Sequence, residues 1–180
     1  NLYTRHRALG TTNNELPISY YSTAASSKFN AYHDAAIIVF SRVGSEGADK
    51  RVANVADHSD PTDHELMLDD NEKALVKYVK EYYQDTPIIV LINSSNILQV
   101  PELNEPKATS EYGVDAIFWV GNTGNNAIEA IGKLLSGEVT PSGHTVEVWE
   151  KDFKKGPTWT NFGQQTQNGL DAYLYNSRGE

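Results

Sequence analysis

The sequence predicts an α/β fold: a three-layer α/β/α sandwich built around a mostly parallel sheet. Three short, uninterrupted apolar runs, at residues 35–40, 87–92 and 116–120, each end in polar or glycine-rich residues. Segments with apolar residues at helical spacing follow the first and the third of these runs. Fully apolar strands that alternate with amphipathic helices are typical of a parallel sheet with both faces covered, and the connections should be right-handed.

The first element is the strand predicted for residues 35–40, and the next is a helix predicted for residues 71–83. The start of the helix is marked by Asp69 or Asp70 as the N-cap, with Glu72 at capping-box distance from Asp69. Its apolar side chains recur at helical spacing: Leu75, Val76, Val79, Tyr82 and Tyr83.

The second strand, 87–92, stops at the polar sequence 93–96, and the third, 116–120, stops at Gly121–Gly124. This last turn leads directly into a helix. It lacks the third glycine of a dinucleotide fingerprint and carries no Walker lysine, so a tight strand-to-helix turn explains it better than a phosphate-binding loop.

The second helix carries its apolar residues on one side: Ala127, Ile128, Ile131, Leu134 and Leu135. Gly137 is its predicted C-cap. After a turn at residues 140–143, the alternation in Thr145–Trp149 predicts a short strand.

The composition limits the partners of the chain. Its 180 residues are enough for one domain with a real core, and the formal net charge is −9. Because no stripe of Lys and Arg is present to neutralise phosphates, we expect no nucleic-acid partner, and an acidic chain is repelled by an anionic membrane surface. No apolar run reaches the length of a membrane span, and without cysteine there is no thiolate chemistry. Neutral ligands such as sugars fit this charge balance.

Both ends differ in character from the middle. Residues 1–26 are rich in Thr, Asn, Ser and Tyr without a clear period, and residues 164–180 are again polar. We therefore expect an irregular N-terminal connector at 1–26, a sandwich domain at 27–163 and a polar connector at 164–180. This pattern suggests a segment of a longer polypeptide.

The loop after the first strand holds the first candidate site residue. Glu46 lies between small residues, in a loop that also carries several charges. Because the carboxyl ends of parallel strands share one edge of the sheet, where ligands bind in open α/β folds, Glu46, Asn93, Asn96 and the 121–124 turn should lie along that edge. An ordinary surface loop explains Glu46 equally simply.

A second polar stretch, residues 57–65, groups acids and histidines as a metal site would. Its spacing matches neither the zinc pattern H-E-x-x-H nor the EF-hand loop. We therefore interpret it as a solvated loop before the first helix, and we expect neither a metal nor a cofactor.

Several of these stretches, taken in order, carry a family resemblance. Arg42 with Ser45–Lys50 is similar to the motif R-x-G-G-E-G-x-D-R, and Leu135–Gly143 is similar to L-x-G-x-x-N-P-S-G. Together with Asp70–Val76, they resemble the second, α/β domain of family 3 glycoside hydrolases, the β-glucosidase-like enzymes, over roughly residues 30–163. Three positions depart mildly from the family pattern: Ser45, Lys50 and Thr140.

The resemblance implies a retaining mechanism that uses two carboxyl groups about 5–5.5 Å apart. It gives the general acid/base role to Glu46. The residues implied in substrate binding or loop support are Arg42, Ser45, Asp49 and Asn93. The family's nucleophilic aspartate belongs to a separate TIM-barrel-like domain, in a motif resembling S-D-W that this sequence lacks. The resemblance thus implies the acid/base half of an enzyme for β-linked glucosides or related sugars, inactive without that barrel domain.

Two other interpretations remain open. One is a stand-alone flavodoxin-like module that binds a sugar or nucleotide at the same edge; the other is a structural domain whose active loop has degenerated. The charges near Glu46 add a further expectation. Arg42, Lys50 and Arg51 should hold the pKa of Glu46 at or below its ordinary value unless another domain desolvates it or supplies a negative charge.

Overall fold

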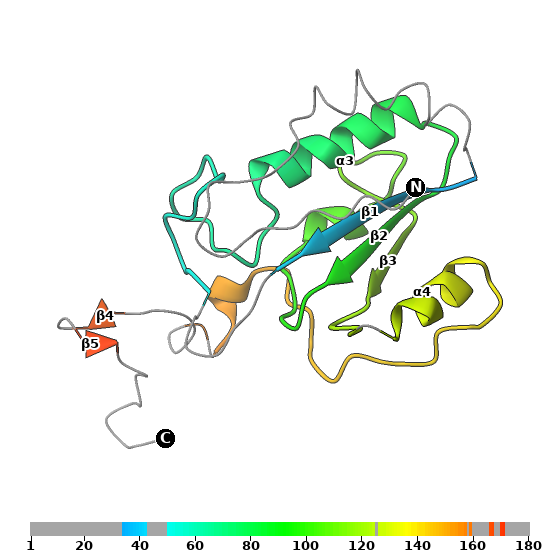
Figure 1. Cartoon of the computed structure of the whole chain (residues 1–180). Coiled ribbons are helices and arrows are strands. Elements are labelled where there is room, and N and C mark those ends of the chain that lie inside the picture. Colours follow the sequence, from blue (N-terminus) through cyan, green and yellow to red (C-terminus); the bar gives the residue numbers. More distant parts are fainter. Residues whose placement is uncertain are drawn as a thin grey trace.

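The computed structural model describes residues 34–42, 50–124, 126–157, 159, 166–167 and 170–171. Within this part, a parallel sheet contains β1 (Ala36–Ser41), β2 (Ile88–Asn93) and β3 (Ala116–Trp119), in the order β1-β2-β3. Figure 1 shows α3 above this sheet and α4 below it in the view. The α/β class with a parallel sheet is therefore confirmed, and the three predicted strands are shifted by at most one residue.

The core lies on the face of the sheet that α3 covers. In register, Ile38 lies beside Val90 and Val90 beside Ile117, so one row of side chains runs across all three strands. The row packs against Val76 and Val79 of α3 in the hydrophobic cluster. This is the burial expected when alternate residues of each strand share a face.

Helix α3 (Asp70–Tyr82) starts where the capping box predicts. The Glu72 backbone N–H donates to Asp69 Oδ1 at 2.8 Å, and the Asp69 N–H donates to Glu72 Oε2 at 3.1 Å. Asp69 rather than Asp70 is thus the N-cap. Both partners are buried, so this end of the helix is held within the fold.

Helix α4 (Ile128–Leu135) ends as the sequence predicts. Gly137 has a φ of 76°, which glycine adopts without steric cost. Its N–H donates to Leu134 O at 3.2 Å, and the Glu138 N–H donates to Lys133 O at 2.9 Å. These two bonds are the Schellman arrangement, which satisfies the last carbonyls of the helix. None of the residues of α4 is buried.

The strand predicted for Thr145–Trp149 is wrong. The segment is irregular, and Val146 and Val148 are 97% and 80% exposed. The Thr145 hydroxyl donates instead to Glu147 O at 3.2 Å, a local bond that competes with strand pairing. Alternation predicts a strand only where a neighbour supplies backbone partners, and none of the described strands pairs with this segment.

The remaining elements are short. The link between β2 and β3 contains the 3-10 turn η1 (Pro101–Asn104), and η2 (Phe153–Lys155) follows the irregular segment. Strands β4 (Thr166–Gln167) and β5 (Leu170–Asp171) form an antiparallel pair. The predicted boundaries at residues 26–27 and 163–164 lie outside the described residues. The helices that the structure describes are all too short or too polar to cross a bilayer.

Candidate functional site

The loops after the three strands meet at the carboxyl edge of the sheet. β1 and β2 end side by side, with Ser41 paired with Asn93. The Arg42 N–H then donates to Asn93 O at 3.4 Å. Beyond β2, Ser94 O accepts a hydrogen bond of 2.7 Å from Trp119 Nε1–H at the end of β3. The parallel topology therefore brings the 42, 93–94 and 119 positions together at this edge. Of the 121–124 turn that the sequence predicts there, Asn122 lies beside Ser95, to whose hydroxyl its side-chain amide donates a hydrogen bond.

Glu46, Ser45 and Asp49 lie in residues 43–49, outside the described residues. The two residues that flank this segment, Arg42 and Lys50, are described, and both are buried in part or fully. The structure therefore describes the site through the contacts of these two flanking residues.

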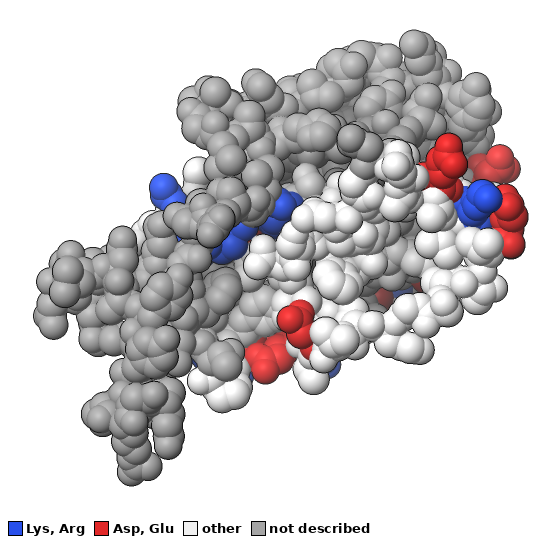
Figure 2. Space-filling model, turned by 60° about the horizontal axis from the view of Figure 1, so that its bottom comes forward, with Lys and Arg blue, Asp and Glu red and all other residues white. Residues whose placement is uncertain are grey.

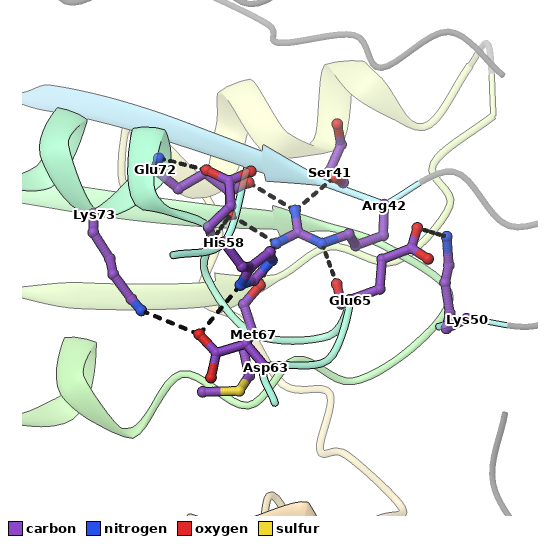
Figure 3. A network of polar contacts seen from close by, with 10 residues as sticks. Ser41, Arg42, Lys50, His58, Asp63, Glu65, Met67, Glu72 and Lys73 are labelled. Carbon is purple, nitrogen blue, oxygen red and sulfur yellow. Dashed lines mark hydrogen bonds and ion pairs between the residues drawn. The ribbon is translucent and has the colours of Figure 1, made fainter. Parts of the chain in front are cut away.

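Arg42 uses all five of its N–H groups inside the protein (Figure 3). Two reach the Glu72 carboxylate, each at 2.7 Å, as a bidentate ion pair. The other three donate to backbone carbonyls: Glu65 O at 2.8 Å, Ser41 O at 2.9 Å and Met67 O at 2.6 Å. The guanidinium thus joins the end of β1, the 65–67 segment and the first turn of α3.

This ion pair is removed from water. The side chains of Arg42 and Glu72 are 6% and 2% exposed. Burial alone would lower the pKa of Arg42, but the carboxylate of Glu72, together with its hydrogen bonds, raises the pKa above its ordinary value. Arg42 therefore stays charged. Glu72 is also a partner in the capping box, because its Oε2 accepts a hydrogen bond from the Asp69 N–H.

Lys50 is anchored on a different carboxylate. Its Nζ donates to Glu65 Oε1 at 3.0 Å, and the Arg51 backbone N–H donates to Glu65 Oε2 at 3.2 Å. The Glu65 N–H in turn donates to Arg51 O at 2.9 Å. Sequence reasoning missed Glu65 as a partner of the Glu46 loop, because no spacing rule connects positions that tertiary folding brings together.

Two of the cations that the sequence places near Glu46 are paired with carboxylates: Arg42 with Glu72 and Lys50 with Glu65. Glu46 itself lies outside the described residues, so the expectation for its pKa stays a prediction.

Among the described residues, those of the 57–65 stretch included, no three His, Cys, Asp or Glu side chains lie together as a metal ion would need. Its histidines diverge: His58 Nδ1 lies 3.3 Å from Asp63 Oδ2, whereas His64 Nε2 lies 3.1 Å from Gln99 Oε1. The interpretation of this stretch as a solvated loop is wrong for His64, which is fully buried and stacks on Phe153.

The burial of His64 had a signal in the sequence. His64, Leu66 and Leu68 alternate with Glu65 and Met67, and the first three are buried while the other two are half-buried. Burial lowers the pKa of His64, so its ring is neutral at pH 7.

Two hollows lie near the carboxyl edge. One, of about 630 Å³, is lined by Trp119 and Trp149 among others, and the other, of about 360 Å³, includes Ser95 and Asn96. The two tryptophans meet edge to face, with ring centroids 6.3 Å apart. On the face presented in Figure 2, the described basic and acidic residues occur in small separate groups, and no continuous basic stripe runs over them.

One of the comparisons with known proteins identifies a family. The family model described as "Glycosyl hydrolase family 3 C-terminal domain" matches residues 9–177, nearly the whole chain. No curated protein and no solved structure matches.

Proposed function

The chain belongs to the glycosyl hydrolase family 3 C-terminal domains, and we propose that it is the acid/base-supplying half of a retaining glycosidase. Glu46 is the general acid/base in this proposal. The substrates are β-linked glucosides or related sugars. A TIM-barrel-like domain of the same polypeptide supplies the nucleophilic carboxylate, and the chain is inactive without it.

The observation that carries this proposal is the origin of the Glu46 segment at the carboxyl edge of a parallel sheet. β1 ends at Ser41, and the backbone N–H of the next residue, Arg42, donates to the carbonyl of Asn93, the last residue of β2. Ligands of open α/β sheets bind outside this edge. The end of β1 at this edge therefore supports the proposal that Glu46, which follows it in the sequence, acts on a sugar held by a second domain.

The chemistry assigns one carboxyl group two successive tasks. In the first step Glu46, protonated, gives its proton to the glycosidic oxygen as the nucleophile of the other domain attacks the anomeric carbon. In the second step Glu46, now a carboxylate, takes a proton from the water that hydrolyses the glycosyl-enzyme. Holding a proton near neutral pH requires desolvation or a nearby negative charge, which the docked barrel domain and its aspartate would provide.

The supporting residues divide between two roles. We assign Arg42 to loop support, because each of its five N–H groups already has an acceptor within the protein. Asn93 supports the same turn through its backbone carbonyl, and its side chain is proposed to contact the substrate. Ser45 and Asp49, which flank Glu46 in the sequence, are proposed to bind substrate or shape the loop around it.

The test compares leaving groups in the full-length protein that contains this chain. For Glu46→Gln, we expect kcat/KM to fall by roughly 10²–10⁴-fold on aryl β-glucosides with poor leaving groups. The loss should be small with good leaving groups, which depart without protonation. Added azide should restore turnover by replacing the general-base step. The control is Glu111→Gln, since Glu111 is an exposed carboxylate paired with Lys77.

Equal losses with both kinds of leaving group would show that Glu46 is not the proton donor. Appreciable turnover by the isolated chain would contradict the proposed division of labour between two domains. Tight binding of a sugar by the isolated chain, without turnover in the full-length protein, would instead favour the stand-alone binding module.

A further inference from the structure

All three tryptophans of the chain line the two hollows near the carboxyl edge of the sheet. Trp119 and Trp149 line the larger hollow, of about 630 Å³, and Trp159 lines the smaller one, of about 360 Å³. Both volumes fall within the range of about 300–1,000 Å³ that is usual for ligand pockets. Because every tryptophan of the chain is found here, the two hollows are a candidate binding site for a ligand that packs on aromatic rings.

The two hollows adjoin at Glu150. This residue lines both of them, and the 145–151 segment to which it belongs contributes further residues to each. Glu150 is half-buried. Within the part of the chain that the structure describes, no hydrogen bond or ion pair occupies its carboxylate. A carboxylate is an acceptor with two oxygens, so Glu150 can accept hydrogen bonds from a ligand in either hollow.

Trp119 has the geometry of a stacking surface. It is 38% exposed, although tryptophan is on average highly buried. Its Nε1–H donates to Ser94 O at 2.7 Å, so the ring is held in place by a hydrogen bond and offers a ligand its apolar face. Trp149 meets this ring at 70°, edge to face. A side chain that is already fixed loses little conformational freedom when a ligand packs on it.

We propose that the two hollows form one binding site for an uncharged oligosaccharide. Trp119 and Trp159 pack against neighbouring sugar units, and Glu150 accepts hydrogen bonds from sugar hydroxyls between them. The choice of β-linked glucose units for the test below rests on the proposed function. The site itself does not depend on the position of Glu46, because described residues line both hollows and Glu46 is not among them.

The polar groups of the lining favour an uncharged, hydroxyl-rich ligand. Besides Glu150, the larger hollow has the Asn104 amide, the Glu105 carboxylate and the Lys151 ammonium. The smaller hollow adds the Ser95 hydroxyl and the Asn96 amide. Among the described lining residues the carboxylates outnumber the single lysine, so a phosphate or another anion would be repelled.

A cation would satisfy only part of this lining. The indole faces and carboxylates suit an organic cation, but the amides and the serine hydroxyl would have no role in holding it. A sugar ring uses all of these groups. Its hydroxyls both donate and accept hydrogen bonds, and its C–H face packs on an indole ring.

The experiment is calorimetric titration of the full-length protein that contains this chain. The probes are a tetrasaccharide of β-1,4-thio-linked glucose units, which glycosidases do not hydrolyse, and methyl β-glucoside. We expect the tetrasaccharide to bind more tightly, because only the longer probe reaches both hollows. Trp119→Leu should weaken its binding by about 10-fold through loss of the stacking surface. Glu150→Gln, which keeps the side-chain size, should also weaken it by about 10-fold through loss of the charged acceptor.

The matched control is Tyr82→Leu. Tyr82 is an aromatic residue of similar exposure, 40%, on α3, and it lines neither hollow. Tyr82→Leu should bind the tetrasaccharide as the wild type does. Circular dichroism checks that each variant is folded. If Trp119→Leu does not fold, Glu150→Gln carries the test, because it changes only one half-buried polar group.

Three results would overturn the inference. One is a wild-type protein that does not bind the tetrasaccharide. Another is a pair of folded Trp119 and Glu150 variants that bind it as tightly as Tyr82→Leu does. The third comes from a titration with choline: binding of choline that is lost in Glu150→Gln, without binding of the tetrasaccharide, would show a cage for a cation instead.

The proposed function fails separately. If Glu46→Gln lacks the leaving-group signature while Trp119→Leu weakens binding of the tetrasaccharide, the acid/base role is wrong and the oligosaccharide site stands. If Glu46→Gln shows the signature while the Trp119 and Glu150 variants bind like the wild type, the acid/base role stands and the oligosaccharide site is refuted.

Discussion

Replacing Arg42 with methionine is the sharpest test of how this fold is held together at the sheet edge. The substitution keeps an apolar stem of similar reach and removes the guanidinium. It leaves the Glu72 carboxylate buried without its cation and takes a donor from three backbone carbonyls. Through this one side chain, β1, the 65–67 segment and α3 are joined.

The size of the stability loss expected for Arg42→Met follows from the burial of the ion pair. Removing one partner of a buried ion pair costs about 3–5 kcal/mol, because the other charge stays in a medium of low dielectric constant. Each buried carbonyl left without a donor adds about 1–3 kcal/mol unless water reaches it. A single domain is stable by only about 5–15 kcal/mol, so Arg42→Met should remove a large part of the free energy of unfolding.

The assay is a double-mutant cycle with Glu72→Met. Urea unfolding of the chain, followed by the fluorescence of its three tryptophans, gives the free energy of unfolding for each variant. The double variant buries no unpaired charge, so it should be more stable than the sum of the single losses predicts, with a coupling of about 0.5–3 kcal/mol.

The exposed pair Lys77–Glu111, with side chains 41% and 69% exposed, is the control, and Lys77→Met should leave the unfolding midpoint almost unchanged. A cost of Arg42→Met below about 1 kcal/mol, or strictly additive losses, would refute the assignment of a buried structural pair.

Three further outcomes are expected from the same unfolding assay. Gly113→Ala should cost about 1–3 kcal/mol of stability, because its Cβ would overlap the backbone carbonyl of Glu105. Gly132→Ala in α4 places its Cβ in open space and should stabilise the fold by about 0.5–1 kcal/mol. Similar effects of the two substitutions would contradict this difference in packing. Burial lowers the pKa of the His64 ring below its usual value of about 6.5. As the pH falls through about 6.5, the ring is therefore protonated in the unfolded chain before it is protonated in the folded one, and the free energy of unfolding decreases. His64→Gln should flatten that slope, and an unchanged slope would exclude His64 as its source. Lys80→Met should lower the free energy of unfolding by about 1–3 kcal/mol, since Lys80 Nζ donates to three backbone carbonyls. A variant as stable as the wild type would show that water replaces the ammonium at these carbonyls.

The parts of the fold that sequence predicts well are those decided by local chemistry. The start of α3 follows from Asp69 and Glu72, whose mutual hydrogen bonds need only three residues of chain. The end of α4 follows from Gly137, which adopts a positive φ at no steric cost. The strands follow from apolar runs, because a strand covered on both faces has no polar side.

The part of the site that sequence did not predict is decided by contacts across long separations. Arg42 and Glu72 lie 30 positions apart, and neither spacing nor composition connects them. The sequence therefore identifies Arg42 only as a charged residue near Glu46 with a role in substrate binding or loop support, and it places Glu65 in a stretch interpreted as a solvated loop. Thr145–Trp149 failed for the complementary reason, because alternation is a local pattern whereas strand pairing needs a partner.

The requirement for arginine at position 42 follows from geometry rather than from substrate. One carbonyl at the end of β1, two carbonyls of the 65–67 segment and the Glu72 carboxylate surround the guanidinium of Arg42. Arginine is the side chain with five N–H donors in a planar fork and a charge that persists when buried, whereas lysine offers three donors from one nitrogen. Since those donors are consumed within the protein, Arg42 has none left for a sugar. We therefore expect the contacts that select the sugar in the proposed active site to come from Ser45, Asp49 and Asn93, or from the proposed second domain, and not from Arg42.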